Sequence, residues 1–521
     1  MHELELKFAV PSYQQGVLRK NIDTKTARQQ RLSAYYFDTP NQHLAKQGIA
    51  LRIRFEDSQW VQTLKTAGDG VAKRVELNTV LSLTGTPDTL DVSSLVPDVS
   101  LITQPTVVAQ LTSIMPLDQL AQALTVEYFT DVQRTSRQIK KNNSRIEIAY
   151  DIGKVGIGRL NSQKHANNHG LTQSDIHEIE FELLEGDPSD LIDIAKTWCK
   201  KYKLYLSTVT KAQRGSLLLA NKQFAEPVKA DLAVLQLHKG ISQFAFLQAV
   251  VNNCLVQILP NASAIAEGSP DGNLVHQLRV GIRRLRTALK HFKFAQDYID
   301  PNWLMVLKQT FSLLGEYRDK EILQIKTQPL LESVGAPHVE WSTAVDIMPI
   351  DAVRANDFQI LLLELIGFTH LAVPADNPKA KATVAKKLEK LFTAIAVASD
   401  KFASLDTESQ HGVRKDLKSL RYVSEFAAPL FASQTNGKKG KKAAELNAFL
   451  QYLEPAQDVL GEYNDNVVGH ANYLEKAKTD PNALFAVGWF SGREQASSEQ
   501  CAVSLKTCLL YTSPSPRDRT R

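Results

Sequence analysis

The chain has 521 residues, of which 43% are hydrophobic and 22% charged, and its formal net charge is +5 at pH 7. This length exceeds what one ordinary core supports, so we expect two or three domains. No apolar run reaches the roughly 18–20 residues of a membrane helix, and the N-terminus shows no signal peptide. The four cysteines lack metal-ligand or disulfide spacing. We therefore expect a cytoplasmic protein without a membrane partner.

The first eight residues, MHELELKF, alternate charged and apolar side chains. A β-strand turns successive side chains to opposite faces, so Glu3, Glu5 and Lys7 share one face. Two carboxylates beside an ammonium suit a divalent cation held next to an anion. A solvated edge strand would show the same pattern, and this segment alone leaves both interpretations open.

The same alternation recurs through the first 215 residues. Strands are predicted at 1–8, on both sides of a turn within 33–57, and at 60–68, 71–80, 126–140, 144–153 and 177–184. Helices are predicted at 14–25 and 188–201, and residues 86–124 form loop and helix. For any one strand the charges could face solvent, but six or more such strands favour a barrel with a charged lumen. Because buried charges need partners, the lumen should hold a polyanion together with cations.

Seven motifs, in order, resemble the CYTH superfamily of triphosphate tunnel metalloenzymes. They are ELELK (3–7), LRIR (51–54), QTLKTAG (62–68), KRVELN (73–78), RIEIAYDIG (145–153), HEIEFELLEG (177–186) and STVTKAQRG (207–215). The resemblance implies an eight-stranded antiparallel tunnel that binds a triphosphate.

The resemblance also implies roles for particular residues. The metal ligands, for Mg²⁺ or Mn²⁺, would be Glu3, Glu5, Glu178 and Glu180. The phosphate contacts would be Lys7, Arg52, Arg54, Lys65, Arg74, Arg134, Lys211 and Arg214. Catalysis would depend most on Glu3, Glu5, Lys7 and Lys211. Glu76, Glu147 and Asp151 would be further ligands or partners of the ligands.

From about Leu235 the hydrophobic period becomes helical, and two motifs recur in the same order. HQLRVGIRRLR (276–286) returns as HGVRKDLKSLR (411–421), and LGEYRD (314–319) returns as LGEYND (460–465), which indicates an internal duplication. Within each repeat the basic residues fall on one helical stripe. The two stripes are His276, Arg279, Arg283 and Arg286, and His411, Arg414, Lys418 and Arg421. A solvated basic face, or pairing with Asp319 and Asp465, is the alternative to an anion groove.

The repeats resemble the CHAD domain, an α-helical module associated with polyphosphate binding. The predicted fold class is therefore α+β, with an antiparallel tunnel followed by an all-α duplicated helical bundle. We expect the CYTH domain at 1–215, a linker at 216–234, the CHAD domain at 235–475 and a C-terminal helix or tail at 476–507. Residues 508–521 resemble translated adapter sequence and are predicted to be non-native.

These features predict a metal-dependent triphosphatase that hydrolyses inorganic tripolyphosphate, with long-chain polyphosphate bound by the helical domain. A class IV adenylate cyclase or a thiamine triphosphatase could use the same tunnel. A scaffold that only binds polyphosphate is the non-enzymatic alternative. Because the basic stripes lack interleaved aromatic residues, nucleic acid is not expected as a ligand.

Overall fold

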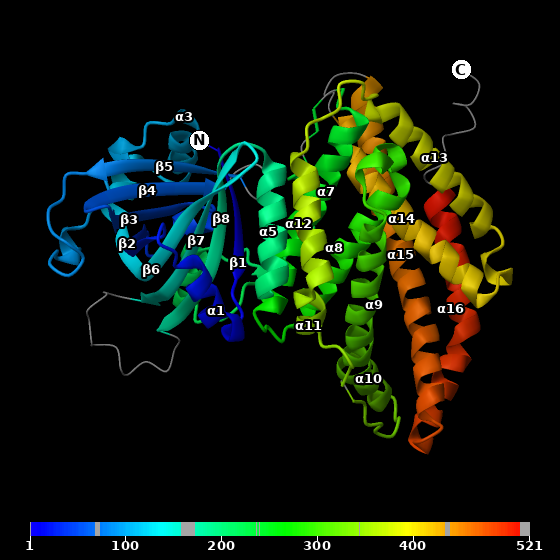
Figure 1. Cartoon of the computed structure of the whole chain (residues 1–521). Coiled ribbons are helices and arrows are strands. Elements are labelled where there is room, and N and C mark those ends of the chain that lie inside the picture. The colour runs from blue at the N-terminus through cyan, green and yellow to red at the C-terminus, as the bar shows by residue number, and fades with distance from the viewer. Residues whose placement is uncertain are drawn as a thin grey trace. The chain divides into compact units, whose positions relative to one another are not determined.

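The computed structural model describes residues 2–67, 73–157, 172–235, 237–238, 240–342, 344–432 and 438–510. The chain divides into two compact units (Figure 1). Unit 1 comprises Met1–Val228, Leu255–Gln277 and Ile350–Leu371. Unit 2 comprises Lys229–Cys254, Leu278–Pro349 and Ala372–Arg521.

Unit 1 is built on an antiparallel sheet of nine strands in the order β5-β4-β3-β2-β6-β7-β8-β1-β9. The strands are β1 (His2–Ala9), β2 (Arg28–Asp38), β3 (Ala50–Glu56), β4 (Gln59–Ala67), β5 (Lys73–Leu81), β6 (Thr125–Lys141), β7 (Ser144–Ile157), β8 (Gln173–Glu185) and β9 (Tyr205–Leu206). β1 also pairs with β5, which links the two ends of the series of eight long strands. The predicted antiparallel β domain is confirmed, with the two-residue β9 as a ninth strand.

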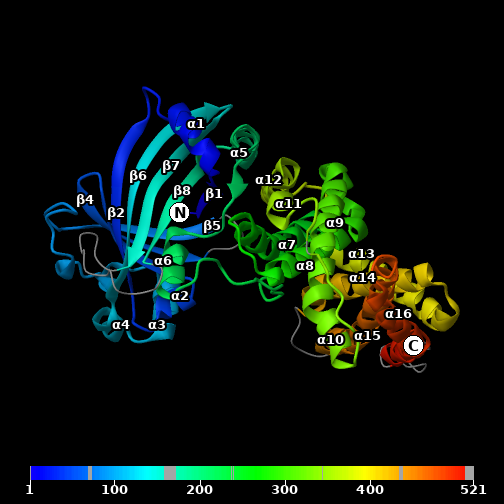
Figure 2. The ribbon, with the colours of Figure 1, turned by 90° about the horizontal axis from the view of Figure 1, so that it is seen from below.

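The predicted alternation of faces is also confirmed. Ile53, Ile179 and Phe181 are fully buried on the apolar side. The charged residues next to them in sequence face the interior of the curved sheet, among them Arg52, Arg54 and Glu180. The long strands β2, β6, β7 and β8 lie side by side and bend together (Figure 2). Burial of the apolar row fixes the register, because a slip of one residue would exchange the two faces.

Helices surround this sheet within unit 1. They are α1 (Ser12–Ile22), α2 (His43–Lys46), α3 (Pro105–Ile114), α4 (Leu117–Ala123), α5 (Pro188–Tyr202), α6 (Lys211–Leu219), α11 (Pro349–Arg354) and α12 (Asn356–His370). α5 packs against α12, and Lys196 forms an ion pair with Glu364 across the two helices at 2.5 Å. Lys211 and Arg214 therefore lie on a helix, which continues past the domain boundary predicted at residue 215.

The remaining main helices belong wholly or partly to unit 2. They are α7 (Gln243–Ala266), α8 (Gly272–His291), α9 (Asn302–Ile322), α10 (Gln328–Ser333), α13 (Ala380–Ser399), α14 (Thr407–Ala432), α15 (Lys438–Lys476) and α16 (Leu484–Leu510). α7 and α8 have residues in both units. The segment predicted to be non-native overlaps the end of α16 at 508–510, and residues 511–521 lie outside the described part of the chain.

One helix differs from the expectation that no segment could cross a membrane. Among the described helices, α7 alone is long and apolar enough, with a mean hydropathy of 1.2 in its most apolar window. However, 78% of that window is buried inside the protein. This burial is what a core helix of a large domain shows, since such helices are apolar on all sides.

Candidate active site

The curved sheet of unit 1 surrounds a cavity of about 960 Å³. Side chains from all eight long strands and from α6 line it. The predicted metal or phosphate ligands that line this central cavity are Glu5, Lys7, Arg52, Arg54, Lys65, Arg134, Glu180 and Lys211. The alternating strands thus bring residues from distant parts of the sequence into one charged chamber.

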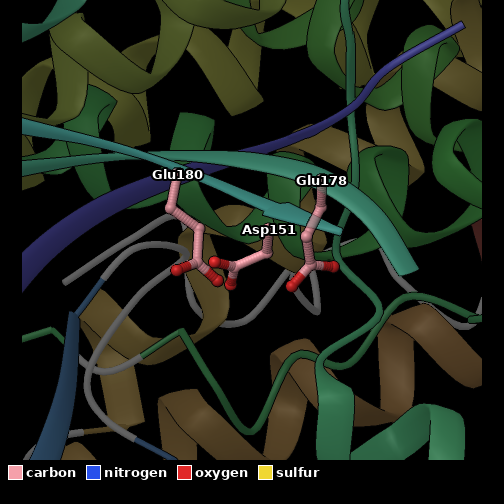
Figure 3. A group of neighbouring side chains, drawn as sticks. All are labelled: Asp151, Glu178 and Glu180. Carbon is pink, nitrogen blue, oxygen red and sulfur yellow. The ribbon is translucent and has the colours of Figure 1, made fainter. Parts of the chain in front are cut away.

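Three carboxylates gather on β7 and β8. One oxygen from each of Asp151, Glu178 and Glu180 lies within 4.8 Å of the others. Asp151 is opposite Glu178 in the β7–β8 ladder, and Glu180 follows two residues later on β8. Figure 3 shows all three side chains on the same side of the strands. Asp151 and Glu178 are almost completely buried, at 0% and 2% exposure.

Two cations hold this carboxylate cluster together. Lys211 Nζ lies 2.7 Å from Asp151 and 3.0 Å from Glu180, and it also forms an ion pair with Glu178. Arg134 donates two hydrogen bonds of 2.7 Å to the Asp151 carboxylate. Burial disfavours the charge on Lys211, but Asp151 and Glu178 outweigh it and raise the pKa of Lys211 well above its usual value. Although burial alone would raise the pKa of Asp151, Lys211 and Arg134 lower it.

Lys7 lies beside the cluster on β1. It is directly opposite Glu180 in the β1–β8 ladder, and its ammonium donates a hydrogen bond to the carbonyl oxygen of Val209. Burial lowers the pKa of Lys7, an effect that Glu178 opposes and Lys211 reinforces. Lys7 is thus a buried amine, and binding of an anion beside it would stabilise its charged form.

A second acidic group lies further along the same strands. Glu5 is opposite Glu182, which is in turn opposite Glu147 on β7. The register therefore places Glu5 nearest to Glu182, and not to the Glu178–Glu180 pair with which the resemblance groups it. Burial, followed by the charges of Glu5 and Glu147, raises the pKa of Glu182. The role of Glu182 was not predicted, although it continues the alternation of Glu178 and Glu180.

The opposite wall of the cavity is more basic. Lys65 forms an ion pair with Glu76, and Arg52 lies 3.9 Å from the same carboxylate. Although burial opposes the change, Lys65 lowers the pKa of Glu76 to about 2. Burial and then the charge of Arg52 lower the pKa of Arg54 to about 10. Arg52 shares Glu76 with Lys65, and Arg54 forms an ion pair with Glu56. Basic groups outnumber acids in this set of five, so it can take up further negative charge.

Four of the predicted ligands are not among the residues that line the cavity. One of them, Glu178, is buried within the carboxylate cluster. The side chains of Glu3 and Arg74 lie outside the described residues, although their backbones pair in the β1–β5 ladder. Arg214 is not among the residues that line the cavity. Its Nη2 lies 3.9 Å from the Glu267 carboxylate.

The basic stripe of α8 surrounds one aromatic ring. The guanidinium groups of Arg279, Arg283 and Arg286 lie 4.7, 5.3 and 5.4 Å from the centre of the Phe311 ring. Arg279 is also 3.6 Å from Asp319, as the alternative interpretation of the stripe expected. His276 is exposed.

The basic stripe of α14 lies close to that of α8. Burial, and then the charges of Arg283 and Arg414, lower the pKa of Lys418 to about 7. Arg421 differs, because its Nε donates to Glu425 at 2.8 Å and its Nη1 to Gln457 at 3.0 Å. His411 shares a hydrogen bond of 2.8 Å with Asn464. Arg283, Arg414 and Lys418 therefore form a cationic cluster to which both repeats contribute. The charge of Asp465 opposes the lowering of the pKa of Arg414 and of Lys418, so the alternative interpretation holds in part.

Two known families match successive parts of the chain. Residues 1–216 match the model of the CYTH domain, and residues 249–472 match that of the CHAD domain. The chain combines a CYTH domain with a CHAD domain. The fold predicted for such a combination is the one observed, an antiparallel β domain followed by an all-α region.

Individual relatives were also found. An inorganic triphosphatase from Haemophilus influenzae is 34% identical over 43% of this chain, and the match spans 56% of that relative. An uncharacterized protein from Mycobacterium tuberculosis is 22% identical over 97% of this chain and 95% of its own. The crystal structure of the CHAD domain from the plant Ricinus communis is 23% identical over 54% of this chain and 96% of that one, with a TM-score of 0.42.

Proposed function

We propose that this chain is a metal-dependent triphosphatase of the cytoplasm that hydrolyses inorganic tripolyphosphate to pyrophosphate and phosphate. The observation that carries the proposal is the cluster of Asp151, Glu178 and Glu180 interleaved with Lys211 and Arg134. Glu180, Lys211 and Arg134 of this cluster line the cavity. Membership in the CYTH family and the similarity to an inorganic triphosphatase support it.

The carboxylate cluster fits a hard divalent cation. Its donors are all carboxylate oxygens, which Mg²⁺ and Mn²⁺ prefer. Oε2 of Glu178 is buried and has no hydrogen-bond partner within the described structure, so it is free to act as a ligand. Asp151, Glu178 and Glu180 would hold the ion. The resemblance adds Glu3 and Glu5 as ligands from β1, although the register places Glu5 beside Glu182 and not beside this cluster. A bound ion would neutralise charge on the phosphate oxygens.

The cations of the cavity would bind and orient the triphosphate. Phosphoryl transfer requires neutralised equatorial oxygens and a nucleophile in line with the leaving group, so positioning supplies most of the catalysis. Lys7 and Lys211 lie beside the carboxylate cluster, whereas Arg52, Arg54 and Lys65 lie on the opposite wall. The ammonium of Lys211 can pair either with its carboxylates or with a phosphate oxygen.

For the CHAD domain we propose binding of long-chain polyphosphate. The supporting observation is the cationic cluster of Arg283, Arg414 and Lys418, in which burial and then the charges of the two arginines lower the pKa of Lys418. Bringing these cations together costs free energy that a polyanion would recover. Each guanidinium can grip phosphate oxygens in a bidentate manner.

The proposed activity can be tested with parallel substrates. The full chain should be incubated with tripolyphosphate, thiamine triphosphate or ATP, with Mg²⁺ or Mn²⁺, and all products analysed. We expect tripolyphosphate to be cleaved fastest, no activity after chelation, and loss of activity in Glu5→Ala. Cyclic AMP as the main product from ATP would identify a cyclase, and preferred cleavage of thiamine triphosphate would identify a thiamine triphosphatase. Binding of tripolyphosphate without turnover would support a scaffold.

A further inference from the structure

We call the four residues Tyr205–Thr208 the strap. They comprise β9 and the two residues that follow it, and they lead to the turn before α6. Its first two residues are held by the helical part of unit 1. The guanidinium of Arg354 lies 4.5 Å from the centre of the Tyr205 ring and donates to its hydroxyl at 3.3 Å. The backbone N–H of Leu206 donates to Oε1 of the buried Gln359 at 2.8 Å.

The next two strap residues are held by Ser263 in the last turn of α7 and by Glu267, the residue that follows this helix. Ser207 Oγ donates to Oε1 of Glu267 at 3.1 Å, and the N–H of Thr208 donates to Ser263 Oγ at 3.2 Å. Ser263 and Glu267 are four residues apart, so a helical turn presents both side chains together. Every strap residue therefore has a polar partner between residues 263 and 359, a region that matches the CHAD model.

The strap also contacts the backbone of Lys7 and leads into the helix that begins at Lys211. The N–H of Ser207 donates to the carbonyl oxygen of Lys7 at 2.9 Å, and one residue after the strap the carbonyl of Val209 accepts from the Lys7 ammonium. Thr210 then caps α6 through a capping box with Gln213. Lys211 is the first residue of α6, so the direction in which the strap enters α6 sets the direction of Lys211.

We propose that the helical residues Ser263 and Glu267 are positioning residues for the proposed triphosphatase reaction, acting through the strap on Lys7 and Lys211. Glu267 has a second role in this arrangement, because its carboxylate also lies 3.9 Å from Arg214 on α6. The chain from residue 1 to 215 would lack these partners and would be cut inside α6. The phosphate site of the CYTH domain is thus completed by residues of the CHAD-matching region.

This inference rests on the proposed function, and the test uses the full chain. Glu267→Leu removes both the acceptor for Ser207 and the charge beside Arg214, whereas Glu267→Gln keeps an acceptor. Since displacements of about 1 Å can cost up to about 100-fold in rate, we expect Glu267→Leu to raise KM for tripolyphosphate about tenfold and Glu267→Gln to raise it less. Glu185→Gln is the matched control, because Glu185 is 71% exposed and lies 3.6 Å from Arg145.

A double-mutant cycle separates positioning from a general loss of structure. If Glu267 acts through Ser207, then Ser207→Ala should add little to Glu267→Leu, because the two residues share one interaction. Misfolding would instead lower kcat in proportion to the lost active protein and leave KM unchanged. Additive effects, or an unchanged KM in Glu267→Leu with an unchanged thermal unfolding midpoint, would overturn the inference.

The two proposals fail in different ways. If the unaltered chain does not hydrolyse tripolyphosphate, the proposed function is wrong. The affinity of the same variants for tripolyphosphate with Mn²⁺, measured by calorimetry, then decides the inference. A drop of about tenfold in Glu267→Leu and not in Glu185→Gln supports positioning of the two lysines. Equal affinities refute it.

Discussion

Two lysines, Lys211 in the cavity of the CYTH domain and Lys418 in a basic stripe of the CHAD domain, have opposite shifts of pKa. Lys211 has three carboxylate partners, which outweigh the effect of burial and raise its pKa well above the usual value. Burial and two arginines lower the pKa of Lys418 to about 7. Lys211 is thus surrounded by acids, whereas Lys418 lies among cations, with Asp465 as an opposing charge.

This difference indicates two kinds of anion binding. In the cavity the carboxylates balance the cations, so a short and highly charged ligand must be accompanied by metal ions to be neutralised. In the helical region the described cations of the cluster repel one another, so a long anion without metal can relieve the repulsion. The first arrangement suits chemistry at one phosphorus atom, and the second suits many weak contacts along a chain.

The largest effect should come from removing a carboxylate of the cavity cluster. Glu180→Gln keeps the size of the side chain but removes its charge, leaving Lys211 and Arg134 with less negative charge around them. We expect kcat for tripolyphosphate to fall by about 10²–10³-fold, the usual cost of losing one preorganised charge-stabilising group, while tripolyphosphate still binds. Metal-dependent turnover and calorimetric binding should be measured together, with Glu185→Gln as the control. Full activity in Glu180→Gln would exclude the cluster from catalysis.

The second effect is expected on binding and not on catalysis, and it concerns the helical stripes. The quadruple substitution of Arg279, Arg283, Arg414 and Arg421 by Ala should abolish retention of long-chain polyphosphate by the full chain and leave tripolyphosphate hydrolysis largely intact. The slope of log affinity against log salt should fall by about 0.7–0.9 for each phosphate group that the variant no longer binds. Since Arg421 already pairs with Glu425 and Gln457, restoring Arg421 alone should recover little binding. A quadruple variant that binds as well as the parent would show that the stripes are structural.

The charged strand faces and the basic helical stripes could both be predicted from local sequence patterns. Alternation at period two identified the charged faces of the strands, and the stripes of basic residues identified α8 and α14, because both patterns depend only on local geometry. The pairing of Glu5 with Glu182 could not be predicted, since register between distant strands is set by packing. The strap could not be predicted either, because Ser263 and Gln359 are ordinary polar residues of apolar helices.

Two further features are visible in the spacing of residues along the sequence. Arg421 and Glu425 are four residues apart on one helix, which is the spacing of an ion pair. Thr210 and Gln213 have the spacing of a capping box, which indicates a helix beginning at Lys211. The first spacing separates Arg421 from the other stripe residues, and the second predicts that Lys211 lies on a helix.

The smallest effect concerns pH. With a pKa of about 7, Lys418 loses its charge as pH rises from 6 to 8. Because its pKa is below that of an unfolded lysine, the unfolded chain binds more protons between about pH 7 and 10, and Lys418 makes the stability rise with pH there. Polyphosphate binding has the opposite dependence, because the anion favours the protonated amine and binding at pH 8 takes up a proton.

Lys418→Arg tests this dependence, because arginine stays charged at these pH values. Polyphosphate affinity of the unaltered chain should fall up to about tenfold from pH 7 to pH 8 through this group, and the variant should lose that part of the slope. Calorimetry at pH 8 in buffers of different ionisation enthalpy measures the proton uptake directly, with the exposed Lys390→Arg as control. If Lys418→Arg and the parent take up the same number of protons, the repelling charges of Arg283 and Arg414 do not govern Lys418, and the cationic cluster is not the polyphosphate site.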